Sequence, residues 1–180
     1  MLRTAILQEH LRTPLYREPM HRWIGLAARL IVGGVWIWAG LLKIGDPASS
    51  VTAVRAYQLL PYDLAETVGH LLPMLELTVG VVLVLGLVTR VSGAVSALLQ
   101  IAFIVGISSV WARGISINCG CFGDGGVDPN AISHYPWEIA RDVGLLLASA
   151  YLVWRPRTAL SVDNVLFPER PVVAEDLERV

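Results

Sequence analysis

Two cysteines, Cys119 and Cys121, are separated by one glycine and are the only cysteines among the 180 residues of the chain. They lie in a loop between two hydrophobic segments, where their thiols can reach each other and a partner. A disulfide across a Cys-x-Cys pair closes a very small ring that departs from relaxed disulfide geometry. Strained, exposed disulfides are the labile or catalytic ones, so the spacing predicts thiol–disulfide exchange by these two residues.

The residues around the pair suit a small reactive loop. Gly120 carries no side chain at the tightest point of the ring, and Phe122 and Gly123 complete the sequence Cys-Gly-Cys-Phe-Gly. The wider segment 112–136 is rich in Gly, Asp, Asn and Pro and is expected to need no regular structure. Because the chain has no second dithiol, the pair must exchange with a partner thiol protein or with a non-thiol acceptor.

Three other interpretations of the cysteine pair stay open. One is a static staple that holds the loop, and another is a pair of reduced, inert thiols. A third is half of a metal site, for which the nearby candidates Asp124, Asp128 and His134 make a poor set of zinc ligands. We therefore predict no metal site and favour redox exchange.

The distribution of apolar residues indicates a membrane protein. The chain is 54% hydrophobic and only 16% charged, whereas soluble domains carry roughly 25% charged residues. Apolar runs at roughly 23–44, 68–87, 91–111 and 137–154 each approach the ~20 residues that cross a hydrocarbon core. Because lipid cannot satisfy exposed backbone polar groups, such runs must be helices. We expect an all-α, polytopic membrane four-helix bundle over residues 23–154.

Basic residues predict how this bundle is oriented. Four arginines precede the first run, Arg90 lies between the second and third, and four arginines follow the fourth. The positive-inside rule then places both termini in the cytoplasm, as a basic or interfacial arm at 1–22 and a tail at 155–180. Loops 45–67 and 112–136 face outward, where disulfides persist. The formal net charge of -1 gives no indication of nucleic-acid binding.

Small residues and prolines predict some finer features of the bundle. Gly33, Gly34 and Gly40 in the first run are typical of helices that pack closely in lipid. A short surface helix is expected within 48–60, because Pro61 would end it. The first run is too long and too late in the chain for a secretory signal.

Four ionisable residues in or near the runs form a second candidate site. Lys43 lies at the outer end of the first run, Glu76 some eight residues into the second, and Arg141 and Asp142 on the first turns of the fourth. Charges within a bilayer are costly and usually face a partner or a cavity. We expect the two cations to balance the two carboxylates in one outer polar cluster. This cluster either binds an acceptor such as a quinone or fixes helix register, and Arg141 can also pair with Glu138 at i, i+3.

The chain resembles the MauE family of DoxX-like membrane proteins. The matching elements, spread from about residue 22 to 154, are Ala39-Gly40-Leu-Leu-Lys43 with Asp46-Pro47, Leu60-Pro61, Pro73-Met-Leu-Glu76 with Gly80, Cys119-Gly-Cys121-Phe122-Gly123, and Arg141-Asp142. The resemblance implies a four-helix, multi-pass protein of a prokaryotic inner or plasma membrane that is linked to disulfide handling. In methylamine utilisation such handling serves the small subunit of methylamine dehydrogenase, beside a thioredoxin-like partner. Nothing in the sequence specifies the client of this chain.

Two functions from different classes follow from these observations. In the first, the chain is a membrane thiol–disulfide oxidoreductase that exchanges with an extracytoplasmic thioredoxin-fold protein or another thiol client, and no cofactor is required unless a quinone serves as acceptor. In the second, it is a non-enzymatic subunit or scaffold of a respiratory or redox complex, and its loop disulfide is structural. Transport through the bundle has little support, because the deep ionisable residues are few and no pair of broken helices is evident.

Overall fold

The computed structural model describes residues 18–123 and 125–166. Residues 1–17 of the predicted arm and 167–180 of the predicted tail lie outside the described part. In chain order, the elements are α2 (Glu18–Ile44), α3 (Pro47–Ala56), α4 (Tyr62–Leu85), α5 (Thr89–Ala112), β1 (Ile117–Cys119), β2 (Gly125–Val127), the 3-10 helix η1 (Ala131–Ser133), α6 (Tyr135–Trp154) and α7 (Val162–Leu166).

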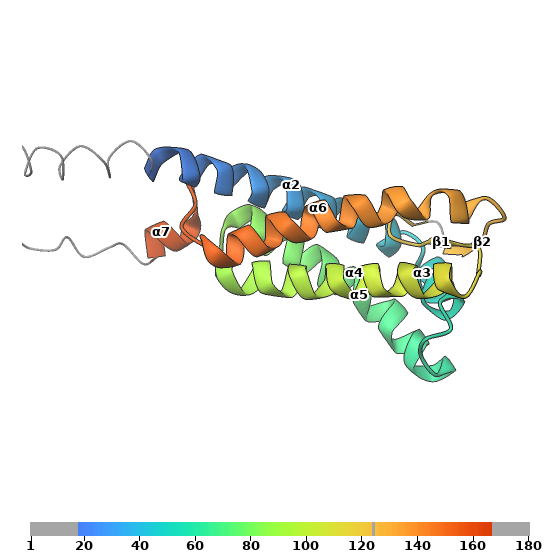
Figure 1. Cartoon of the computed structure of the whole chain (residues 1–180). Helices are drawn as coiled ribbons and strands as arrows, with labels where there is room; N and C mark the ends of the chain where they lie inside the picture. The colour runs from blue at the N-terminus through green and yellow to red at the C-terminus, as the bar shows by residue number, and fades with distance from the viewer. Residues whose placement is uncertain (1–17, 124, 167–180) are drawn as a thin grey trace, which may run out of the picture.

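Four long helices, α2, α4, α5 and α6, run along the length of the molecule (Figure 1). The most extensive helix contacts are those of α2 with α4 and of α5 with α6, and α2 also packs against α6. The short elements α3, β1, β2 and η1 gather at one end, which we call the loop end. The opposite end, which we call the termini end, carries the beginning of α2 and the short helix α7.

Three helices in the described part of the chain are long and apolar enough to cross a membrane. They are Met20–Ile44 within α2, together with the whole of α4 and the whole of α5. The predicted spans thus reappear as helices, but α4 begins at Tyr62, earlier than the sequence analysis expected. The fourth predicted span forms α6, a helix of 20 residues that carries three charged residues in its first turns.

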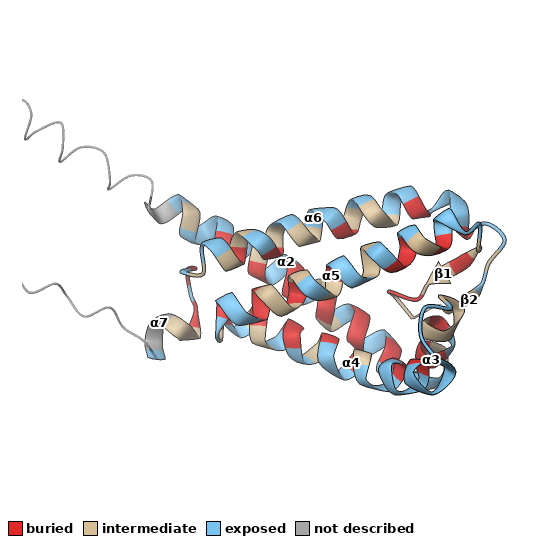
Figure 2. Ribbon diagram, turned by 60° about the horizontal axis from the view of Figure 1, so that its bottom comes forward, coloured by how far each residue is buried: buried red, intermediate tan, exposed pale blue. Residues whose placement is uncertain are grey.

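The bundle buries polar side chains and exposes apolar ones. Large apolar residues face outward along the helices, including Trp38 (63% exposed) and Leu98 (66% exposed). The buried set includes several polar or charged side chains, and Figure 2 shows buried positions turned toward the centre of the bundle. This inverted pattern fits a protein whose outer surface meets lipid, because intramembrane polar groups face the interior of a bundle. These polar residues are Arg29, Lys43, Glu76, Thr89, Ser92, Ser96, Gln100, Asp142 and Ser149.

Glycines bring α2 and α4 into close contact. A Cβ atom at Gly80 would lie 2.8 Å from the carbonyl oxygen of Gly33, and one at Gly40 would lie 3.0 Å from the carbonyl oxygen of Pro73. Only glycine allows such an approach of two backbones, as the small residues of the first run led us to expect. The contact sets the register of the two helices and places Lys43 beside Glu76.

The segment between α5 and α6 is more ordered than the sequence analysis expected. Strands β1 and β2 pair antiparallel, with Cys119 opposite Gly125. The fully buried Tyr135 accounts for this order, because its hydroxyl accepts a hydrogen bond from the backbone N–H of Ile117 and lies 2.9 Å from the carbonyl oxygens of Ile115 and Ile117. One aromatic residue on α6 thus holds the first strand of the hairpin against the helix.

The chain after α6 folds back under the bundle at the termini end. Arg29, a residue of α2, is buried. It donates hydrogen bonds to the hydroxyl of Thr158 at 2.8 Å and to the carbonyl oxygen of Leu160 at 2.9 Å. The carboxylate of Asp163 accepts the backbone N–H groups of Val88 and Thr89, which begin α5. These contacts close the bundle at the end opposite to the cysteines.

Candidate functional site

One face of α3 holds the cysteine loop. Ser49, Ala53 and Tyr57 follow one another at intervals of four residues and therefore share a face of the helix and its C-terminal cap. The Ser49 hydroxyl donates to the carbonyl oxygen of Gly123 at 2.9 Å, and the Tyr57 hydroxyl donates to that of Cys119 at 2.8 Å. The loop is therefore anchored on both sides of the cysteine pair.

Gly120 fits between the cysteines for two reasons. Its φ angle is +68°, in the left-handed region that L side chains rarely adopt. A Cβ atom at this position would also lie 2.5 Å from the Cβ atom of Ala53 on α3. The sequence analysis assigned Gly120 to the tightest part of the loop, and the close approach to α3 is a second requirement that only the structure reveals.

The two cysteines are free thiols in the structure, and their surroundings differ. Cys119 is half-buried, whereas Cys121 is 7% exposed. The backbone N–H of Cys121 donates to the Sγ atom of Cys119 at 3.4 Å, and the Cys121 thiol lies 3.9 Å from the Cys119 carbonyl oxygen. The pair is thus arranged with Cys121 as the donor and Cys119 as the acceptor.

This arrangement favours a thiolate on Cys119. The hydrogen bond from the Cys121 thiol is the main cause that lowers the pKa of Cys119, against an opposing effect of burial. The same hydrogen bond, and then burial, raise the pKa of Cys121. Because the thiolate is the nucleophilic form of cysteine, these pKa directions favour Cys119 as the nucleophile of the pair.

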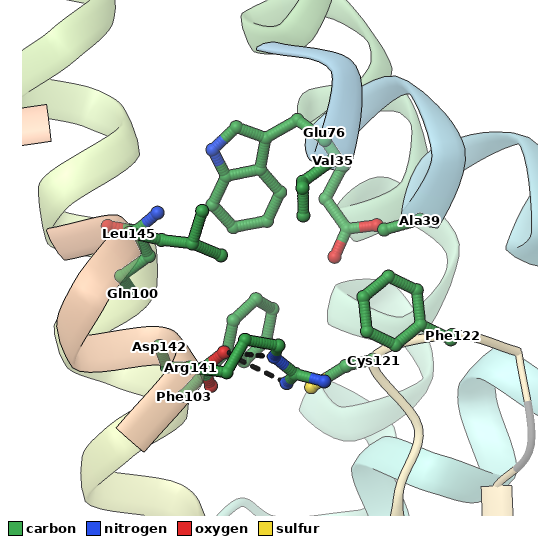
Figure 3. A pocket seen from close by; sticks show the side chains of 11 residues that line it. Val35, Ala39, Glu76, Gln100, Phe103, Cys121, Phe122, Arg141, Asp142 and Leu145 are labelled. Carbon is green, nitrogen blue, oxygen red and sulfur yellow. Dashed lines mark hydrogen bonds and ion pairs between the residues drawn. The ribbon is translucent and has the colours of Figure 1, made fainter. Parts of the chain in front are cut away.

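Cys119 and Cys121 open onto different spaces. Cys119 lines an outer groove of about 140 Å³ at the loop end, together with Asn118, Gly120, Phe122, Glu138 and Arg141. Cys121 lines an inner cavity of about 20 Å³ among the helices. Figure 3 shows this inner cavity, whose remaining lining residues are Val35, Trp36, Ala39, Glu76, Gln100, Phe103, Phe122, Arg141, Asp142 and Leu145.

The Phe122–Arg141 contact stands between the groove and the cavity. Both residues line both spaces. The Arg141 guanidinium lies 4.8 Å from the centroid of the Phe122 ring, within the range of a cation–π interaction. The loop residue Phe122, for which the sequence predicted a supporting role, is therefore also part of the lining that the groove and the cavity share.

Three of the four predicted ionisable residues, Glu76, Arg141 and Asp142, line the inner cavity, and the fourth, Lys43, pairs with Glu76. Lys43 forms an ion pair with Glu76 at 2.5 Å, and Arg141 forms one with Asp142 at 2.9 Å. Lys43 also lies 5.6 Å from the ring centroid of Phe103. The i, i+3 pairing of Arg141 with Glu138 that the spacing suggested is absent from the described ion pairs, because Arg141 turns to its neighbour Asp142.

Sequence reasoning missed a polar chain that crosses the bundle beside the cavity. The Trp36 indole donates to Ser96 at 2.7 Å, Ser96 lies 2.9 Å from Ser149, and Ser149 donates to the Oε1 atom of Gln100 at 3.3 Å. Tyr57 was likewise overlooked. The spacing of four between Ser96 and Gln100 was a usable signal in the sequence, whereas the partners on α2 and α6 were not visible in it.

The inner cavity does not fit a quinone. Small-molecule sites in proteins typically enclose about 300–1,000 Å³, whereas this cavity encloses about 20 Å³, which is room for about one water molecule. The expectation that the polar cluster binds a quinone therefore finds no space in this structure.

The fold and the site define a multi-pass membrane protein of apolar helices that carries a dithiol loop at one end of its bundle. The family model for methylamine utilisation protein MauE matches residues 21–155, and the chain belongs to this family. The match includes the cysteine loop and all four ionisable residues of the inner cluster. Comparisons with curated proteins and with solved structures gave no match.

Proposed function

We propose that this chain is a membrane thiol–disulfide exchange protein in which Cys119 reacts with the client and Cys121 resolves the mixed disulfide. The observation that carries the proposal is the separation of the two thiols, with Cys119 in the outer groove and Cys121 in the inner cavity. A client thiol or disulfide that enters the groove meets Cys119 first. Cys121 is shielded from the client by the Phe122–Arg141 contact.

In the proposed exchange, the electrons that the client gains are those that the two cysteines of this chain lose. The Cys119 thiolate attacks a client disulfide, so a bond forms between Cys119 and one client sulfur while the other client sulfur leaves as a thiolate. Cys121 then loses its proton and attacks the Sγ atom of Cys119, which releases the second client thiolate. The client disulfide is reduced by two electrons, and the Cys119–Cys121 pair is oxidised to a disulfide. The reverse sequence oxidises a client dithiol.

The proposal includes a four-helix bundle with its loop end outside the cytoplasm and both termini inside. We propose α6 as a fourth span, which is supported by its 20 residues and by its extensive packing along α5. The charges in its first turns lie near the loop end, where Arg141 and Asp142 neutralise each other. The outward orientation is supported by the basic residues of the sequence, and it places the cysteines where disulfides persist.

The proposed client is a thiol protein of the extracytoplasmic space, and a thioredoxin-fold protein suits this role. The groove beside Cys119 is small and carries one cation and one anion, Arg141 and Glu138. Such a groove accommodates a single cysteine on an exposed segment rather than a folded domain. The family's association with methylamine utilisation supplies one setting for disulfide formation. Methylamine metabolism itself is not part of the proposal.

The competing function is a membrane subunit or scaffold of a redox complex, in which a Cys119–Cys121 disulfide is a staple. The redox state of the pair in intact cells separates the two. Intact cells are left untreated, treated with mild reductant, or treated and then washed free of it, and each sample is labelled with a membrane-impermeant, mass-tagged maleimide before an acid quench. Exchange predicts that reductant makes both thiols reactive from outside and that its removal restores the disulfide. A disulfide that resists mild reductant would favour the scaffold.

A further inference from the structure

Three buried polar atoms around the inner cavity lack partners among the described residues. They are Oε2 of Glu76, Nε2 of Gln100 and Oδ2 of Asp142. Their side chains are 0%, 2% and 4% exposed, and all three line the cavity. Leaving a buried polar atom unpaired costs about 1–3 kcal/mol, so three such atoms on residues that line one space favour a polar occupant of that space.

The chemistry of these atoms matches one water molecule. Two carboxylate oxygens accept hydrogen bonds, and the Gln100 amide nitrogen donates one. A water can donate to Glu76 and to Asp142 and accept from Gln100, and it keeps one lone pair for the Cys121 thiol. Buried waters typically make about three hydrogen bonds and need about 10–15 Å³, which the cavity of about 20 Å³ provides. Figure 3 shows the Glu76 and Cys121 side chains approaching this space from different elements.

The charges around the cavity come from α2, α4 and α6, whereas α5 contributes the uncharged Gln100 and Phe103. Lys43 on α2 pairs with Glu76 on α4, and Arg141 pairs with Asp142 on α6, so two cations balance two anions. Arg141 donates through both Nε and a terminal nitrogen to the same oxygen of Asp142, each at 2.9 Å. The second oxygen of Asp142 is thereby left for another partner. Asp142, Lys43 and Arg141 each interact electrostatically with the Cys121 thiol.

We propose that the inner cavity binds one water molecule, which carries the proton of Cys121 to Asp142 during exchange. This inference rests on the proposed function and assigns the proton of its second step. In that step, the Cys121 thiol gives its proton to the water, and the water passes one of its own protons to Oδ2 of Asp142. The resulting Cys121 thiolate attacks the Sγ atom of Cys119, and the client thiolate leaves through the outer groove. Gln100 and Glu76 position the water and do not receive the proton.

The test separates attack by Cys119 from resolution by Cys121. One equivalent of 4,4′-dipyridyl disulfide is mixed with the reduced full-length protein in lipid nanodiscs, and each release of thiopyridone is followed by absorbance. The first release reports attack by Cys119, and the second reports attack by Cys121. The Asp142→Asn and Gln100→Leu variants should keep the first rate and slow the second about 10- to 100-fold, as expected when a general base is lost. The second rate of the wild-type protein should also fall in D₂O.

The variants Gln100→Leu and Glu66→Gln keep the test decisive if Asp142→Asn fails to fold. Gln100→Leu retains both inner ion pairs and removes the amide that holds the water, together with the acceptor of the Ser149 hydrogen bond. Glu66→Gln changes an exposed carboxylate at the loop end, which pairs with Arg55, and should alter neither rate. A second release that keeps its rate in Gln100→Leu and in folded Asp142→Asn would overturn the water relay and leave the exchange function intact. A wild-type protein that gives no second release would instead overturn the exchange function itself.

Discussion

The Arg141 guanidinium packs 4.8 Å from the centre of the Phe122 ring, and these two residues line both the space that Cys119 faces and the space that Cys121 faces. On one side, Cys119 lines the outer groove. On the other side, Cys121 lines the inner cavity with the buried carboxylates of Glu76 and Asp142. A short loop thus gives two neighbouring cysteines distinct surroundings, which is the requirement for one to attack and the other to resolve.

The pH dependence of alkylation should differ between the two cysteines. A lowered pKa means that the Cys119 thiolate is present at lower pH than in an ordinary cysteine, whose pKa is about 8.5. The raised pKa of Cys121 has the opposite sign, so its thiolate forms only at higher pH. Iodoacetamide rates across pH, read by mass spectrometry of each cysteine, should show Cys119 reacting first. Equal midpoints for the two cysteines would contradict the assignment of the nucleophile.

Replacing one member of the inner Lys43–Glu76 ion pair should destabilise the bundle more than replacing both members. Lys43→Met leaves the Glu76 carboxylate buried without its partner, which costs about 3–5 kcal/mol in comparable buried pairs. The double variant Lys43→Met with Glu76→Met removes both charges and should recover most of that loss. Unfolding in mixed micelles measures both. A double variant as unstable as the single one would mean that the pair does more than neutralise its own charges.

The close packing of α2 on α4 gives a matched pair of glycine substitutions. Gly80→Ala introduces a Cβ atom 2.8 Å from the backbone of α2 and should cost about 1–3 kcal/mol, as overpacking does. Gly34→Ala adds the same atom at an exposed position with no neighbour within 4 Å. It should be neutral or stabilise the helix by up to about 1 kcal/mol. Thermal unfolding of both variants in the same detergent tests the contact, and equal losses would refute it.

The long apolar segments correctly predicted helices, because lipid leaves few alternatives to such a segment. The sequence analysis also anticipated the cysteine loop and the inner charges, since charges and thiols stand out in an apolar chain. Gly33 and Gly40 were correctly assigned to close helix packing, whereas the same prediction was wrong for Gly34, which is exposed with nothing within 4 Å. What the sequence could not supply were contacts between distant segments. The link from Tyr57 to Cys119 joins residues 62 apart in the chain, and no local pattern marks it.

The Tyr57 hydroxyl should position the cysteine loop without taking part in the chemistry. Burial is the main cause that raises the pKa of Tyr57, so its hydroxyl stays protonated and donates to the Cys119 carbonyl. Tyr57→Phe should lose about 1 kcal/mol of loop stability and speed hydrogen exchange of the loop amides. Tyr62→Phe, at an exposed position, is the control. If the loop amides of Tyr57→Phe exchange hydrogen at the wild-type rate, the other α3 contacts suffice to hold the loop.

The central claim is that Cys119 meets the client and Cys121 resolves the bond, and trapping in cells tests it most directly. Cys121→Ser and Cys119→Ser variants are expressed, quenched with acid and compared on non-reducing gels with identification of any adduct. We expect Cys121→Ser to accumulate a reducible, higher-mass adduct through Cys119, and Cys119→Ser to accumulate little, because Cys121 is buried behind Phe122 and Arg141. No adduct in either variant, or an adduct only in Cys119→Ser, would contradict the account.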